Sequence, residues 1–251
     1  MAELAGIFLH PVKALDAVAV SEARVLASGA LAHDRRWALI DSAGHFVNGK
    51  NRAAVHEVRA RFDVSSWEIE LDGRVFSLVQ QAHELGAYFS DRLGEPVRLH
   101  QNDAVGFPDD LDASGPTCVS QASLEQVGEW FGFALNEVRA RFRTNLELGG
   151  VEAFWEDQLY GNAFYAGNVE IHAVNPCQRC VVPSRHPLTG AVTSGFQKLF
   201  TRRRQASFPA TASRVQFNHY YRFAVNTRIA PTEAGKILRV GDEIRFRDPA
   251  A

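Results

Sequence analysis

Residues 175–190 have the sequence NPCQRCVVPSRHPLTG, which places Cys177 and Cys180 three positions apart between two apolar segments. The flanking residues Ile171–Val174 and Val181–Pro183 are apolar and rich in β-branched side chains, which is typical of strands. A thioredoxin-like redox pair would instead need its cysteines at the start of a helix in a βαβ unit. The segment therefore predicts a β-rich fold around the two cysteines and disfavours a redox-active pair.

The cysteines leave several kinds of chemistry open. The chain has three, Cys118, Cys177 and Cys180, which are too few for a disulfide framework or for the four thiolates of an iron–sulfur cluster. A zinc site would need further ligands, and no second C-x-x-C is present. Cys177 and Cys180 can be small buried side chains, or one of them can be a thiolate that acts as nucleophile or metal ligand. Arg179 lies between them and would lower the pKa of such a thiolate.

Length and composition exclude several classes of protein. The chain has 251 residues, of which 46% are hydrophobic and 22% charged, with a net charge of −2. This is the composition of one large or two small globular domains, and it is neither disordered nor collagen-like. The absence of a basic excess argues against a nucleic-acid partner. No apolar run is long enough to cross a membrane and no signal peptide is evident, so we expect a cytoplasmic protein without a membrane partner.

Short β-like segments separated by turn residues dominate the chain and predict a mainly β or α+β fold, barrel-like, with a few helices. The Asp72-Gly73 pair predicts a hairpin between Trp67–Leu71 and Val75–Leu78. Other strands are expected at Gly6–Phe8, Val18–Val25, Trp37–Ile40, Val58–Phe62, Pro96–His100, Glu137–Phe142, Leu146–Leu148, Val169–Val174, Gln178–Val182, Tyr220–Thr227 and Arg239–Phe246.

Two segments have helical periodicity. The first carries its apolar side chains from Ala82 to Leu93 and ends before Gly94. The second has Ser120 as its N-cap. Its buried face would consist of Leu124, Val127, Phe131 and Leu135. A long loop, Gln101–Gly115, precedes it, so we place a domain boundary there, with domains at residues 1–100 and 101–251. The basic run Arg202–Arg204 is expected to face solvent, or to dock an acidic electron donor.

Motifs along the whole chain resemble those of MOSC proteins, named after the C-terminal domain of molybdenum cofactor sulfurases. In chain order the stretches are HPVKALDAVAV (10–20), GALAHDRRWALIDSAGHFV (29–47), ARFRTNLEL (140–148), PCQRCVVPSRHPLTG (176–190), FQKLFTRRR (196–204) and GKILRVGD (235–242). They are similar to the family patterns P-V-K-S, G-L-x-x-D-R-x-W, F-R-P-N, P-C-x-R-C and V-G-D. The resemblance implies a MOSC-type β-barrel preceded by an N-terminal barrel domain, and is greatest to amidoxime-reducing components.

The resemblance also implies a cofactor and its ligands. Cys180 matches the cysteine that binds molybdenum, for which a soft thiolate is suited. Contacts of the molybdenum cofactor (Mo-molybdopterin), including its phosphate, are expected from Lys13, Arg35, Arg143 and Asn145, with Ser114, Tyr220 and Arg179 as further candidates. Lysine and arginine are suited to phosphate because they offer a point charge and a two-pronged donor. The chain departs from the family pattern at Ala14, Gln178 and Asn218 and in the stretch Ser184-Arg-His186.

The function implied is reduction of N-hydroxylated compounds, such as amidoximes, by removal of an oxygen atom at the cysteine-bound metal. No G-x-G-x-x-G dinucleotide fingerprint is present, so electrons would come from a separate flavin, haem or iron–sulfur protein. Two alternatives remain. Cys180 can carry a persulfide and deliver sulfur to a metal centre, or the chain can bind molybdopterin without catalysing a reaction.

Overall fold

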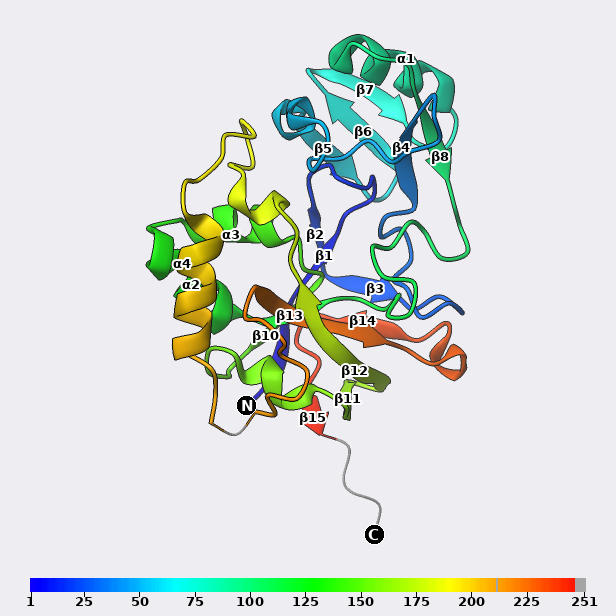
Figure 1. The fold of residues 1–251 in the computed structure, drawn as a ribbon. Helices are drawn as coiled ribbons and strands as arrows, with labels where there is room; N and C mark the ends of the chain where they lie inside the picture. Colours follow the sequence, from blue (N-terminus) through cyan, green and yellow to red (C-terminus); the bar gives the residue numbers. More distant parts are fainter. Residues whose placement is uncertain (211, 247–251) are drawn as a thin grey trace.

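The computed structural model describes residues 1–210 and 212–246 (Figure 1). An eight-stranded sheet runs in the order β15-β11-β12-β13-β9-β10-β1-β2, and within it only the β9–β10 pair is parallel. A bridge between Glu3 and Glu243 also brings β1 against the start of β15, so the sheet closes on itself as a barrel. Its strands are β1 (Glu3–Leu9), β2 (Val18–Val20), β9 (Cys118–Ser120), β10 (Leu146–Gly149), β11 (Ala163–Ala166), β12 (Val169–Gln178), β13 (Arg222–Arg228) and β15 (Ile244–Phe246).

Smaller sheets are built mostly from the N-terminal part of the chain. The pair β3–β14 extends the barrel, whereas β4–β8 and β5–β6–β7 lie above it with α1 (Figure 1). These elements are β3 (Glu22–Arg24), β14 (Ile237–Arg239), β4 (Trp37–Asp41), β8 (Val97–Gln101), β5 (Ala60–Asp63), β6 (Glu68–Leu71), β7 (Arg74–Ser77) and α1 (Ala82–Leu93). Because β1 and β2 also belong to the large sheet, the N-terminal segment ties the upper part to the barrel.

Three further α-helices gather on one side of the barrel (Figure 1). They are α2 (Gln121–Phe131), α3 (Leu135–Phe142) and α4 (Phe196–Ala206). Short 3-10 helices complete the described secondary structure: η1 (Ala53–Glu57), η2 (Trp155–Leu159), η3 (Val182–Ser184) and η4 (Pro231–Glu233). None of the helices in residues 1–210 and 212–246 combines the length and apolar character needed to cross a membrane.

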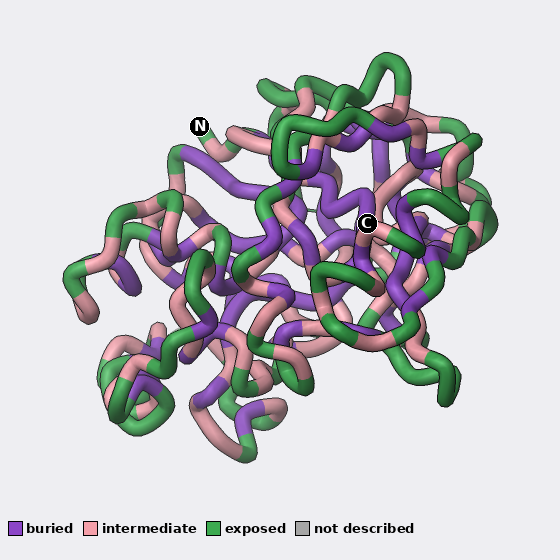
Figure 2. Tube along the Cα trace, turned by 90° about the horizontal axis from the view of Figure 1, so that it is seen from above, coloured by how far each residue is buried: buried purple, intermediate pink, exposed green. Residues whose placement is uncertain are grey.

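Buried side chains form three clusters, and the buried segments converge inside the molecule while the exposed ones form its outline (Figure 2). One cluster fills the barrel, and another, made only from residues 12–99, fills the upper part. The third lies beneath α2, α3 and α4 and is rich in phenylalanine, including Phe142, Phe196 and Phe200. The predicted division into domains after residue 100 stays a prediction.

The fold class and several local elements are confirmed. Asp72 and Gly73 have φ of 49° and 75°, which is the geometry of a two-residue turn between paired strands. Gly94 ends α1 with φ 71°. Ser120 caps α2, because its side-chain oxygen accepts a hydrogen bond from the backbone N–H of Ser123 at 3.1 Å. The sheet-rich α+β architecture predicted from the sequence is therefore correct.

Other elements differ from the prediction. The segment Glu137–Phe142, expected to be a strand, is most of helix α3, in which Val138 and Phe142 share the buried face one turn apart. Leu135 begins this helix and is not part of α2, since Gly132 ends α2 with φ 70°. The expected strand Gln178–Val182 is also wrong, because β12 ends at Gln178 and the chain turns into η3 before Pro183.

The remaining differences are at boundaries and in helix α4, which the sequence reasoning missed. Residues 18–25 form two short strands, β2 and β3, and residues 239–246 are split by a turn in which Gly241 has φ 93°. Arg204, expected to face solvent with its neighbours, is 1% exposed and forms an ion pair with Asp157. Arg202 and Arg203 are exposed as expected.

Candidate functional site

A cavity of about 1250 Å³ lies between the barrel and the upper part of the molecule. Its walls come from the end of β1, the loop at residues 48–59, the loop at residues 105–115, α3 with the turn that follows it, and the end of β12. Segments that are far apart in the sequence therefore meet here. All the predicted site residues except Tyr220 line it: Lys13, Arg35, Ser114, Arg143, Asn145, Arg179 and Cys180.

Tyr220 lies elsewhere. Its ring packs against Phe208 and Phe217, with centroids 5.7 Å and 5.8 Å away. The neighbouring Tyr221 is closer to the cysteine segment, because its hydroxyl donates a hydrogen bond to the carbonyl of Cys180 at 3.1 Å. Tyr221 thus holds the backbone of the predicted metal ligand, a contact that the sequence reasoning did not foresee.

Cys180 follows the last residues of β12 and lines the cavity as a free, half-buried thiol. Its sulfur accepts a hydrogen bond from the backbone N–H of Val182 at 3.5 Å, which fixes the position of the thiol. Arg179 makes the turn rigid, since its guanidinium donates to the carbonyl of Phe223 at 2.7 and 2.9 Å and to that of Phe142 at 3.1 Å. Arg179 therefore holds in place the backbone segment that presents Cys180.

The other two cysteines are placed differently. Cys118 is buried in β9, where burial strongly raises the pKa of its thiol. Cys177 lines the cavity beside Cys180, and burial raises its thiol pKa although the positive charge of Arg179 opposes the effect. A thiol with a raised pKa is a poor nucleophile at neutral pH. Cys177 is therefore a poor candidate for a reactive thiolate.

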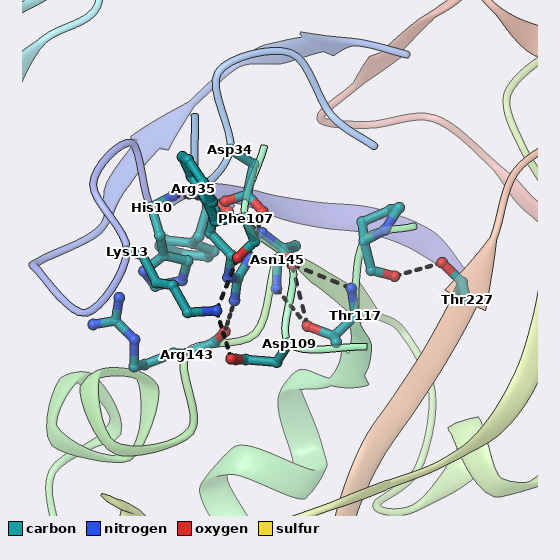
Figure 3. A network of polar contacts seen from close by, with 12 residues as sticks. His10, Lys13, Asp34, Arg35, Phe107, Asp109, Thr117, Arg143, Asn145 and Thr227 are labelled. Atoms are coloured by element: carbon teal, nitrogen blue, oxygen red, sulfur yellow. Dashed lines mark hydrogen bonds and ion pairs between the residues drawn. The ribbon is translucent and has the colours of Figure 1, made fainter. Parts of the chain in front are cut away.

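Three cations line the same cavity (Figure 3). Lys13 donates hydrogen bonds from Nζ to the carbonyl of Phe107 at 2.8 Å and to the Oδ1 atom of Asp109 at 2.6 Å. Arg35 forms an ion pair with Asp34. Burial lowers the pKa of Arg35, but the carboxylates of Asp34 and Asp109 outweigh it and raise that pKa, so the guanidinium stays charged.

Of these three cations, Arg143 has no hydrogen-bonded or ion-paired partner for its guanidinium within the described residues. In Figure 3 its side chain points away from the contact between Lys13 and Asp109, and no dashed line reaches its nitrogens. Burial and the nearby charge of Arg35 lower the pKa of Arg143 to about 10. The side chain still carries its charge at neutral pH. A guanidinium that lines a cavity with no hydrogen bond or ion pair of its own is a donor set for a bound anion.

Asn145 organises this part of the cavity. Its Oδ1 atom accepts from the N–H of Thr117 at 3.2 Å and from Nη1 of Arg35 at 3.3 Å, and its Nδ2 donates to the carbonyl of Phe8 at 3.0 Å. The side chain is 1% exposed. With its amide used by the protein, Asn145 positions Arg35. Ser114 likewise uses its hydroxyl internally, donating to the carbonyl of Ser28 at 3.0 Å.

The backbone is strained at three residues that line the cavity. Ala14, Arg35 and Arg143 have φ of 75°, 48° and 54°, in the left-handed region that side chains with a Cβ rarely adopt. Such conformations persist when surrounding contacts enforce them, and they are frequent at functional sites. Here the backbone N–H of Arg35 donates to the carbonyl of His10, and that of Arg143 to the carbonyl of Arg139, each at 2.8 Å.

Two cavity residues were not singled out from the sequence. His10 is 2% exposed and lies beside Arg35 and Arg143, and burial together with these charges lowers its pKa well below the usual value, so its ring is neutral. Asp109 lies in the long loop Gln101–Gly115 that was expected from the sequence. The signal for His10 is its place directly before the P-V-K motif. Nothing in the sequence indicates that Asp109 reaches Lys13, 96 residues away.

The donor set fits a metal held mainly by its own organic ligand. In residues 1–210 and 212–246, no group of three or more His, Cys, Asp or Glu side chains could hold a metal ion. The cavity instead offers one half-buried thiol, Cys180, together with the unpaired cation Arg143 and the phosphate-type donors Lys13 and Arg35. One soft ligand and an anion site suit a metal complex with a phosphate tail.

Two family models match the chain, the MOSC N-terminal beta barrel domain over residues 1–74 and the MOSC domain over residues 114–245. The chain belongs to the MOSC domain family. This confirms the resemblance drawn from its motifs, and it places the cavity where residues of both matched regions meet.

Two curated relatives of this MOSC protein are both called mitochondrial amidoxime-reducing component 1. The chain is 26% identical to the one from Danio rerio over 73% of this chain and 69% of the relative. It is 24% identical to the one from Xenopus laevis over 74% of this chain and 66% of the relative.

Two solved structures are similar to this MOSC protein. The YuaD protein from Bacillus subtilis is 11% identical, with a TM-score of 0.45 over 98% of this chain and 94% of that one. YiiM from Geobacillus stearothermophilus is 15% identical, with a TM-score of 0.31 over 53% and 54% of the two chains.

Proposed function

We propose that this MOSC protein is a molybdenum-cofactor-dependent reductase of N-hydroxylated compounds, with Cys180 as the protein ligand of the metal. The observation that carries the proposal is one cavity lined by the half-buried thiol of Cys180, by the guanidinium of Arg143, which has no ion-pair partner within the described residues, and by Lys13 and Arg35. The amidoxime-reducing relatives support the reaction class.

The residues of the cavity would divide the work of holding the cofactor. Lys13, Arg35 and Arg143 would bind the phosphate of the pterin through their charged nitrogens, and Cys180 would bind the metal through its thiolate. Asn145 and Asp34 hold Arg35 in place, because both accept hydrogen bonds from its guanidinium. Arg179 and Tyr221 hold the backbone that presents the sulfur.

When bound, the cofactor supplies two-electron chemistry that removes an oxygen atom from the N-hydroxylated substrate. The protein supplies binding, orientation and a partly enclosed site that excludes bulk water. The substrate is thus a small molecule that enters from the part of the cavity next to Cys180. The electrons come from a separate flavin, haem or iron–sulfur protein that docks over the cavity.

Metal and pterin content test this function directly. The full chain and its Cys180→Ala variant are produced in a host that makes the cofactor, and molybdenum and pterin are measured per chain. Cys177→Ala is the matched control, because it removes the neighbouring thiol from the same cavity. We expect about one molybdenum per chain in the wild type and the control, little in Cys180→Ala, and amidoxime reduction only where molybdenum is present.

The same experiment separates the alternatives. If neither the wild type nor the control holds molybdenum, and intact-mass analysis shows a reducible gain of one sulfur atom on Cys180, the protein is a sulfur carrier. If wild-type protein binds pterin and metal yet reduces no N-hydroxylated compound with any electron donor, it is a cofactor-binding protein. Either result would overturn the proposed reductase.

A further inference from the structure

Asp109 occupies the anion position at Lys13. The Oδ1 atom of this carboxylate lies 2.6 Å from Nζ of Lys13, and the ammonium also donates to the carbonyl of Phe107 at 2.8 Å (Figure 3). The lysine expected to hold a phosphate is thus already paired with a negatively charged oxygen of the protein. An incoming phosphate must either share Lys13 with this carboxylate or replace it.

The surroundings of Asp109 resemble those of a bound anion. Partial desolvation raises its pKa, but Lys13 and, at longer range, Arg35 and Lys50 outweigh that effect and lower the pKa to about 2. The carboxylate is therefore charged at every physiological pH. Lys50 lines the same cavity and, within the described residues, has no ion-pair partner. The cations around Asp109 therefore interact with a negatively charged oxygen that belongs to the protein's own loop.

The side chains of Lys13 and Asp109 differ in how far they are exposed to solvent. The side chain of Lys13 is 10% exposed, whereas that of Asp109 is 71% exposed at the cavity edge. The loop is anchored just before Asp109, because the N–H of Phe107 donates to the carbonyl of Arg35 at 2.8 Å. At Gly106, φ is 66°, and a Cβ atom would lie 2.8 Å from the carbonyl oxygen of Asp34. Asp109 can therefore turn into solvent without displacing the anchored part of the loop.

We infer that Asp109 is an exchangeable internal anion: its carboxylate holds Lys13 until a phosphate monoester enters the cavity, and it then turns toward solvent. This inference rests on the proposed function, because it names the residue that controls entry to the phosphate part of the same site. A ligand with a single negative charge gains little by replacing a carboxylate that is tethered beside Lys13. A phosphate dianion gains more from the surrounding cations. Asp109 thus acts as a specificity-determining residue that favours phosphate monoesters over carboxylates.

The test uses the full chain without metal, and inorganic phosphate as the probe. Phosphate and acetate are titrated by calorimetry at constant ionic strength into the wild type, Asp109→Asn and Asp112→Asn. The control removes the same charge from the same loop, at an exposed residue that does not line the cavity. We expect Asp109→Asn to bind phosphate about tenfold more tightly than the wild type and to gain measurable acetate binding. Asp112→Asn should match the wild type.

Hydrogen exchange gives a second measurement that does not depend on a variant. Phosphate binding to the wild type should increase amide exchange at Asp112 and Ala113, whose N–H groups donate to the Oδ1 atom of Asp110 at 2.9 and 3.2 Å, and should leave the anchored Phe107 amide unchanged. If Asp109→Asn binds phosphate no more tightly than the wild type, or if phosphate slows exchange at Asp112 and Ala113, Asp109 is a permanent part of the site and the inference fails. It fails equally if none of the proteins binds phosphate.

These outcomes are independent of the test of the proposed function. Molybdenum bound through Cys180 with no effect of Asp109→Asn on phosphate affinity would refute the exchange alone. Tighter phosphate binding by Asp109→Asn in a chain that never acquires molybdenum would refute the reductase alone.

Discussion

Replacing Glu156 with glutamine should stabilise the protein above pH 7 and stabilise it much less at pH 5. Glu156 is 1% exposed in η2, and its carboxylate accepts hydrogen bonds from the N–H of Ser120 at 3.2 Å and the hydroxyl of Ser123 at 3.1 Å. Burial, and then the negative charge of Asp157, raise its pKa from 4.5 to about 7. Glutamine keeps the accepting oxygen and removes the ionisable group.

The sign of this change in stability follows from the raised pKa of Glu156. The folded protein holds the proton of Glu156 more tightly than the unfolded chain, so this group favours the folded state below about pH 4.5. That contribution is lost as the pH rises from about 4.5 to about 7. A difference of about 2.5 pKa units corresponds to about 3 kcal/mol of unfolding free energy. At about 2–4 °C per kcal/mol, the midpoint of thermal unfolding should rise by about 6–12 °C in the variant at pH 8.

The assay is thermal unfolding of both proteins at pH 5, 6, 7 and 8. Glu152→Gln is the matched control, because Glu152 is exposed in the same segment and should show no pH-dependent difference. A Glu156→Gln variant that is less stable than the wild type by the same amount at every pH would refute the reasoning. That result would mean that the ionised carboxylate is needed in the fold, as a second partner for the buried Arg204.

Two other substitutions test charges with opposite effects on stability. Arg204→Met should lower the free energy of unfolding by about 3–5 kcal/mol, because it leaves the buried Asp157 unpaired. The control Arg203→Met, on the exposed face of α4, should lower it by less than about 0.5 kcal/mol, and equal unfolding midpoints for the two variants would contradict this prediction. Arg143→Gln should raise the midpoint of thermal unfolding, because it removes a desolvated charge that Arg35 repels. The same variant should bind phosphate about tenfold more weakly in calorimetry. A lower unfolding midpoint would show that the guanidinium stabilises the protein when no anion is bound.

The parts of the fold that could be predicted depend on local chemistry. The Asp72-Gly73 turn and the Ser120 cap are fixed by residues within a few positions of one another, so the sequence contains their whole cause. Helix α3 is different, because its residues alternate as a strand does and also satisfy a helical face. Distant contacts decide between them: Arg141 donates to the carbonyls of Pro183 at 2.9 Å and Arg185 at 2.7 Å.

The site residues also divide into those that the sequence could predict and those that depend on distant contacts. The motifs of the chain indicated that Lys13, Arg143 and Cys180 belong together, and one cavity brings them together. The motifs could not show that the hydroxyl and amide groups next to them are used inside the protein. Nor could they indicate Asp109, because its contact with Lys13 depends on how the 105–115 loop crosses the cavity. The type of a residue predicts which groups its side chain can bind. The fold decides whether that side chain already has a partner inside the protein.

The cavity wall carries costs that the rest of the molecule must offset. Three residues with a Cβ atom lie in the left-handed region, each at about 1–2 kcal/mol, and two guanidinium groups repel each other there. These costs are met by packing elsewhere, including the phenylalanine-rich cluster beneath α2, α3 and α4. A bound phosphate would offset the repulsion between Arg35 and Arg143 with its own negative charge. Part of its binding energy is therefore stored in the folded protein before the anion arrives, which is how a preorganised site gains affinity.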